Sequence, residues 1–137
     1  MSDRFRTFDE FWPYYVREHS KPLTRKFHFV GTAAAMACTV AAVRFKRPGL
    51  LAAALVAGYG PAWVSHFFIE KNKPATFQYP LWSLLSDFKM FGMMLRGEMD
   101  AEVARVMAAE EAKGTGKSTS PHDPVPANAP ADPHSVN

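Results

Sequence analysis

Two long apolar runs occupy the middle of the chain and predict a pair of membrane-spanning helices. The first, Phe27–Val43, contains no charged residue, and the second, Leu50–Ile69, has His66 as its only strongly polar side chain. A helix over the first run covers roughly 25 Å, slightly less than the ~30 Å core of a bilayer, whereas the second run has the length that a span requires. Pro61 is expected to kink the second helix. The short basic loop 44–49 joins the two runs as an antiparallel hairpin.

An amphipathic segment precedes the hairpin. Thr7 and Glu10 form a capping box that starts a helix, and Pro13 is expected to bend that helix or delay its start. The residues that share one face of this helix are Phe8, Phe11, Trp12, Tyr15 and His19. An aromatic face of this kind is typical of a helix that lies in the lipid headgroup layer.

Two further helices are predicted after the hairpin. The segment 77–95 is apolar apart from Ser83, Ser86, Asp87 and Lys89, which give the helix a polar stripe, and we expect it to pack against the hairpin. The pattern of Gly97–Ala112 is typical of a short charged helix at the surface.

These elements predict an all-α fold: an integral membrane helical bundle built on a transmembrane hairpin with amphipathic flanking helices. Residues 1–112 form this helical membrane domain, and residues 113–137 are predicted to be a disordered polar tail. The tail explains why the mean hydropathy of the whole chain is slightly negative, at −0.17. The single cysteine, Cys38, excludes an intrachain disulfide, and residues 1–18 lack the apolar core of a signal peptide.

Three histidines fall where an antiparallel hairpin brings them to one side of the bilayer. His28 opens the first apolar run, His66 lies near the end of the second, and His19 precedes both. Imidazole is the commonest protein metal ligand and binds iron, zinc or copper, so this spacing predicts a metal site at the membrane surface. An ionisable residue within an apolar helix is costly and usually functional, which makes His66 the strongest of the three candidates.

The residues alone leave other interpretations open. His19 also fits a polar tip at the membrane interface, and His28 fits a helix cap or a headgroup contact. Glu70, one turn after His66, fits a fourth ligand, an acceptor that orients the ring, or a base. Asp87 fits a catalytic or orienting role, or an ion pair with a basic residue. The sequence contains no Gly-rich phosphate loop, cysteine pair or Gly-x-Ser-x-Gly elbow.

The distribution of basic residues predicts how the chain is oriented in the membrane. The formal net charge is +3, and the basic side chains gather at the ends of apolar segments, which favours an anionic lipid surface and excludes a nucleic-acid platform. On the side of the histidines they are Arg4, Arg6, Arg17, Lys21, Arg25, Lys26, Lys71 and Lys73, and in the opposite loop Arg44, Lys46 and Arg47. This imbalance predicts a multi-pass protein whose histidines face the cytoplasm, in the inner membrane of a bacterium or the endoplasmic reticulum of a eukaryote.

The segments around the histidines carry a family resemblance. They are Phe11-Trp12-x-x-Tyr15 leading to His19, then His28, then His66 with Glu70–Phe77, and finally Pro80–Met90. Together they resemble the 2-hydroxy fatty acid dioxygenase family of small membrane proteins, whose fungal member acts in phytosphingosine breakdown. The resemblance covers about Phe8 to Gly97. The chain departs from it at Thr24, where Asn is common, and at Ser20, where the fungal protein has a second His.

The resemblance implies an Fe(II)-dependent enzyme that shortens a 2-hydroxy fatty acid by one carbon with molecular oxygen. It implies that His19, His28 and His66 hold the iron. The residues expected to bind the substrate are Lys71, Asn72, Lys73 and Thr76. Two alternative functions stay open: a non-catalytic membrane protein that binds metal or lipid headgroups, and a zinc-dependent lipid hydrolase. The sequence predicts no oligomeric state.

Overall fold

The computed structural model describes residues 4–116 of the 137-residue chain. These residues are almost entirely helical and contain no strand, which confirms the all-α fold class. The elements in chain order are α1 Phe8–Glu18, α2 Pro22–Arg44, α3 Gly49–Val64, the π-helix η1 Ser65–Glu70, the 3-10 helix η2 Ala75–Phe77, α4 Pro80–Leu95 and α5 Met99–Gly116. The polar tail was predicted for residues 113–137; residues 113–116 belong to α5, and residues 117–137 lie outside the described residues.

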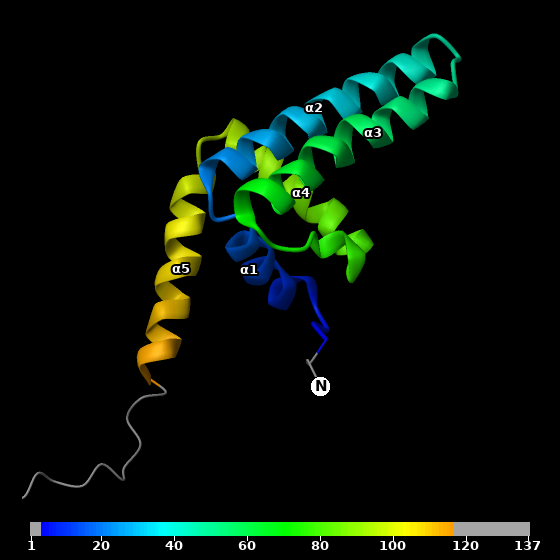
Figure 1. Cartoon of the computed structure of the whole chain (residues 1–137). Helices are drawn as coiled ribbons and strands as arrows, with labels where there is room; N and C mark the ends of the chain where they lie inside the picture. The colour runs from blue at the N-terminus through cyan, green and yellow to red at the C-terminus, as the bar shows by residue number, and fades with distance from the viewer. Residues whose placement is uncertain (1–3, 117–137) are drawn as a thin grey trace, which may run out of the picture.

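The helices α2 and α3 form the antiparallel hairpin that the apolar runs predict, and it projects beyond the remaining helices (Figure 1). Gly31 allows the two helices to pack closely, because a Cβ atom there would lie 3.0 Å from the carbonyl oxygens of Ala57 and Gly58. Both arms are long and apolar enough to cross a membrane. Much of their apolar surface points outward: Val43 is 75% and Val56 72% exposed.

The buried core of the protein lies at the base of the hairpin, between α1, α4 and α5. Its fully buried members are Phe11, Trp12, Tyr15, Val16, Ala75, Met90, Met99 and Val106. The expectation that the aromatic face of α1 lies in the headgroup layer is therefore wrong. The physical reason is that α4 and α5 supply a complementary apolar surface, so this face is buried against protein.

The start of α1 follows its capping signal. The N–H of Glu10 donates to the side-chain oxygen of Thr7, as expected for an N-cap. The helix begins at Phe8 and continues through Pro13, so the proline does not delay the start.

The two C-terminal helices lie against the rest of the molecule. The rings of Phe29 on α2 and Phe91 on α4 stack at 4.6 Å between centroids, which confirms that α4 packs against the hairpin. The indole N–H of Trp12 donates to Glu102 of α5 at 2.7 Å. The predicted surface helix is present as α5 and extends four residues past Ala112, to Gly116.

The second arm of the hairpin changes its helical form before it ends. After Val64 the chain continues as the π-helix η1, where sequence analysis expected a kinked α-helix. Two local features accompany the change: Pro61 has no N–H, and the hydroxyl of Ser65 donates to the carbonyl of Ala62 at 2.7 Å. Short π-helical turns occur frequently at functional sites, and this one carries His66.

Candidate metal centre

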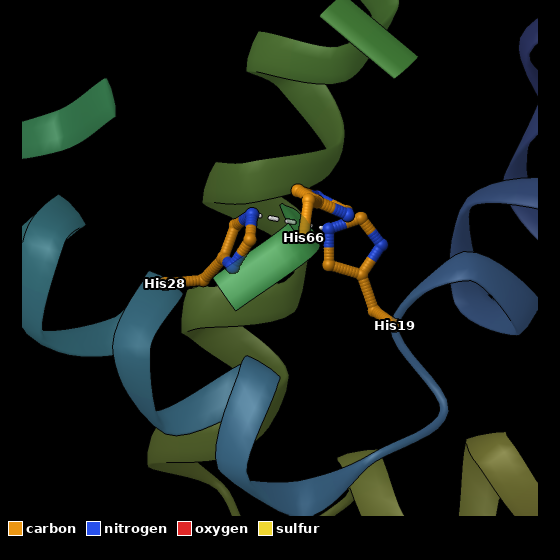
Figure 2. Close-up of side chains that lie close together, drawn as sticks. All are labelled: His19, His28 and His66. Carbon is orange, nitrogen blue, oxygen red and sulfur yellow. Dashed lines mark hydrogen bonds between the residues drawn. The ribbon is translucent and has the colours of Figure 1, made fainter. Parts of the chain in front are cut away.

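The structure brings His19, His28 and His66 together at the base of the hairpin. His19 directly follows α1, His28 belongs to the first turns of α2, and His66 belongs to η1. All three side chains are buried, and one ring nitrogen of each lies within 4.8 Å of the corresponding nitrogens of the others. The rings converge on one point from three separate elements (Figure 2).

The three imidazole planes are nearly perpendicular to one another. The interplanar angles are 84° for His19 and His28, 86° for His19 and His66, and 89° for His28 and His66. The ring centroids are 4.5, 4.5 and 5.1 Å apart in the same order. Stacked rings would crowd each other, whereas perpendicular rings can present three nitrogen atoms to a single small ion.

Local helix geometry sets the tautomer of two of these rings. His19 Nδ1 lies 2.7 Å from the carbonyl oxygen of Tyr15, and His28 Nδ1 lies 3.1 Å from that of Thr24. Each acceptor is four residues earlier in the chain. A carbonyl oxygen only accepts, so each Nδ1 carries the proton and each Nε2 keeps its lone pair.

An amide from outside the helix orients the third ring. His66 Nδ1 lies 2.7 Å from Asn72 Oδ1. The amide nitrogen of Asn72 donates to the backbone carbonyl of Glu18 at 3.1 Å and to its carboxylate at 2.7 Å. These two contacts place the amide oxygen toward His66, which therefore donates from Nδ1 like the other two rings.

With these tautomers, the facing Nε2 atoms show whether a metal fits between the rings. His19 Nε2 and His28 Nε2 are 3.1 Å apart, and with both Nδ1 atoms protonated this contact brings two lone pairs together. Such an arrangement is repulsive unless a cation lies between the nitrogens. Burial holds the pKa of His19 well below its usual range, and the neighbouring imidazoles lower it further, so the ring stays neutral. Three neutral imidazoles fit a first-row transition metal such as iron, zinc or copper.

A carboxyl group adjoins the triad. Asp87 Oδ1 lies 4.0 Å from His28 Nε2 and accepts a short hydrogen bond from the hydroxyl of Tyr15. The ring of Tyr15 stacks on His19 with 4.0 Å between centroids. Burial raises the pKa of Asp87 to about 7, although the hydrogen bond from Tyr15 opposes that shift. Asp87 can therefore hold or release a proton near neutral pH beside the ring nitrogens of the triad.

The other predicted site residues lie in two groups. Thr76 lines the small cavity that also contains the three histidines and Asp87. Glu70 instead accepts a hydrogen bond from the backbone N–H of Lys21 at 2.8 Å, and Lys71 and Lys73 are exposed on the surface. The structure therefore brings Thr76 to the triad and leaves Glu70 and the two lysines outside it.

For two residues at the site, the sequence predicted no role there. Arg25 is buried, donates to the carbonyls of His19 and Ser20 at 2.9 and 2.6 Å, and pairs with Asp100 at 2.7 Å. It holds the loop that carries His19, although its position beside an apolar run suggested a lipid contact. Ser83 lines the small cavity, and its buried hydroxyl has no hydrogen-bond partner among residues 4–116. The sequence placed Ser83 in the polar stripe of this helix, on the same side as Asp87, but gave it no role at the site.

Comparison with known families agrees with this geometry. Residues 5–99 match the model of the family described as 2-hydroxy-palmitic acid dioxygenase Mpo1-like. The chain belongs to this family. The Mpo1-like region extends from before α1 to the first residue of α5, so it includes the histidine triad, Asn72 and Asp87. No curated protein and no solved structure matches the chain.

Proposed function

We propose that this Mpo1-like protein is a membrane-embedded, Fe(II)-dependent dioxygenase that shortens 2-hydroxy fatty acids by one carbon. The observation that carries the proposal is the buried triad of neutral imidazoles whose Nε2 atoms face one another. The family description supplies the substrate class and the reaction type. In the proposed reaction, a 2-hydroxy acid and O₂ give the acid one carbon shorter, CO₂ and water, with cleavage of the bond between C1 and C2.

The chain's own residues divide the work in this proposal. His19, His28 and His66 hold the iron, which supplies the redox chemistry with oxygen. Asp87, beside the triad, takes up the proton that the substrate releases on binding. The unpaired hydroxyl of Ser83 and the side chain of Thr76 bind the carboxylate and hydroxyl of the substrate, since both line the same cavity.

The remaining predicted residues act at a greater distance. The exposed Lys71 and Lys73 attract the carboxylate before it reaches the cavity, an effect that high salt would screen. Asn72 orients His66, and Glu70 binds the start of α2 through Lys21. In this proposal the hairpin crosses a bilayer, which makes the protein multi-pass, and the metal site faces the cytoplasm; the excess of basic residues near the triad supports that orientation.

The direct test is turnover of 2-hydroxypalmitate by protein purified anaerobically and supplied with Fe(II). The proposal expects oxygen uptake and formation of the acid with fifteen carbons. His66→Ala abolishes both metal binding and turnover, and the matched control His134→Ala, in the C-terminal segment, leaves both unchanged. Stoichiometric zinc without oxygen uptake would favour the hydrolase, and the absence of a stoichiometric metal would favour a non-catalytic membrane protein.

A further inference from the structure

An apolar groove leads away from the histidine triad along the hairpin. Its volume is about 440 Å³, and it lies between α2, α3 and α4. His28 and Asp87 line its inner end and also line the small cavity of the triad. The two spaces therefore adjoin at these side chains, which places the groove where the tail of a ligand with its polar end at the triad would extend.

Beyond the triad the groove is mainly apolar, and its polar side chains there are Thr32, Thr39 and Tyr59. Its side walls are formed by Met36 and Val40 of α2, Leu55 of α3, and Leu84 and Phe88 of α4. One polar side chain near the far end is already satisfied, because the hydroxyl of Thr39 donates to the carbonyl of Ala35 at 2.8 Å. The lining therefore has its ionisable groups, His28 and Asp87, at one end and mainly hydrocarbon along the remainder, which suits an amphiphile with one polar head.

The length of the groove matches a long acyl chain. Its lining on α2 runs from His28 to Val40, which corresponds to roughly 18 Å of helix rise. A zigzag of carbon–carbon single bonds of about 1.5 Å advances about 1.3 Å per carbon, so the groove accommodates about fourteen carbons beyond the head group. Each buried methylene contributes about a fourfold gain in binding, so the groove can distinguish acyl chains by length.

The side of the groove is open toward the medium around the hairpin. Leu55 and Val40, on its rim, are 63% and 68% exposed. The floor of the groove lies at Gly58 and Ala35, where α2 and α3 pack closely: a Cβ atom on Gly58 would lie 3.4 Å from the Cβ of Ala35. A chain dissolved among lipid tails can thus slide sideways into the groove without leaving an apolar environment.

We infer that this groove is the acyl-chain site of the enzyme and that Met36, about two thirds of the way along, and Thr39, near the far end, determine chain length. The inference rests on the proposed function, since that function supplies a substrate with a polar head and an apolar tail. The inference adds residues that select the chain length, a property that the histidine triad alone does not determine.

The test uses two bulky substitutions in the groove and one outside it. Met36→Trp blocks the groove about two thirds of the way along, and Thr39→Trp blocks its far end. Val43→Trp is the matched control, because Val43 lies on the same helix but outside the groove lining. Turnover is measured with saturated 2-hydroxy acids of eight to twenty carbons in protein reconstituted with Fe(II).

For the unmodified protein we expect the highest kcat/KM near sixteen carbons. Met36→Trp lowers kcat/KM for 2-hydroxypalmitate at least tenfold and leaves the ten-carbon acid within twofold. Thr39→Trp moves the optimum by only a few carbons, and Val43→Trp leaves the profile unchanged. Loss of activity by the same factor at every chain length in Met36→Trp and Thr39→Trp, or no change at any length, would overturn the inference.

A photocrosslinking experiment separates this inference from the proposed function. The probe is 2-hydroxypalmitate that carries a diazirine at its terminal carbon, and labelled peptides are identified by mass spectrometry. Labelling of 36–40 or 54–55 that unlabelled 2-hydroxypalmitate displaces supports the groove, even if the protein shows no turnover. Labelling elsewhere, labelling of a second copy of the chain, or equal displacement by a diacyl phospholipid would overturn the acyl-chain site while leaving the dioxygenase proposal to its own test.

Discussion

The base of the molecule buries its apolar side chains, whereas the hairpin that projects from it exposes many of them (Figure 1). In the base, Phe11 and Val16 are fully buried among residues of α1, α4 and α5. In the hairpin, large side chains such as Val43 and Val56 point outward. The base therefore has its own protein core, whereas residues 4–116 leave much of the hairpin's apolar surface uncovered, as an apolar surrounding medium would favour.

The histidine triad lies where these two regions meet. His19 comes from the end of α1 in the base, and His28 and His66 come from the two arms of the hairpin. Contacts across the junction hold it together: Arg25 of α2 donates to the carbonyl of His19, and Asn72 links His66 to Glu18. A metal at this point would bind only the state in which both regions are docked, so metal binding would stabilise the junction.

The largest effect on stability is expected in the base. Phe11→Ala removes a ring that packs against Tyr79 and Trp82 at centroid distances of 5.2 and 5.6 Å. We expect it to lower the free energy of unfolding by about 3–5 kcal/mol, measured by denaturant titration in detergent micelles. The control is Phe45→Ala at the hairpin tip, where the ring is 64% exposed and the expected change is below about 0.5 kcal/mol. Equal effects of the two substitutions would contradict the comparison.

The hairpin should respond most to a charge on its outer face. Val56→Asp puts a carboxylate near the middle of the arm Gly49–Glu70, where membrane insertion is expected to lose about 2.5–3.5 kcal/mol. The protein should then shift from the membrane pellet to the supernatant on alkaline carbonate extraction. Met107→Asp, at an exposed position on α5 in the base, is the control and should leave the membrane fraction unchanged. A hairpin that tolerates Val56→Asp as well would not lie in hydrocarbon.

Sequence periodicity was sufficient to predict the hairpin and the convergence of the histidines. It was insufficient to predict how the helices of the base pack. Two charge-free runs and a short loop determine which ends lie side by side, so His28 and His66 could be paired without a structure. The aromatic face of α1 shows only that one side must be buried. Lipid and protein satisfy that requirement equally, and only the position of α4 and α5 decides between them.

Interactions between residues that lie far apart in the chain also could not be predicted from the sequence. Asn72 was expected to bind the substrate, but its amide contacts His66 and Glu18, and Glu18 lies far away in the sequence. Arg25 was counted as a membrane-surface charge, although it is buried against the loop of His19. A hydrogen-bond partner depends on tertiary packing, which local spacing does not encode.

Removal of the Asn72 amide tests the junction between the two regions. Asn72→Ala deprives His66 Nδ1 of its acceptor and releases Glu18, so we expect a 10–100-fold loss of Fe(II) affinity, measured by competition with a chelator. The matched control is Gln78→Ala, which removes an exposed amide from the same connecting segment. Unchanged affinity in Asn72→Ala would show that the ring is oriented without help from the base.

The smallest expected effect concerns the attachment of α5 within the base, and it depends on pH. Hydrogen bonds from Arg105 and then from Trp12 lower the pKa of Glu102 to about 2, below its ordinary value of 4.5. The ionised carboxylate therefore stabilises the fold above about pH 4.5, and this contribution disappears as the pH falls toward 2. Glu102→Gln should cost about 1 kcal/mol at pH 7, measured as the difference in unfolding free energy, and almost nothing near pH 2. Glu111→Gln on the same helix is the control, and a cost of Glu102→Gln that stays constant from pH 7 to pH 2 would show that the charge on Glu102 does not hold α5 to α1.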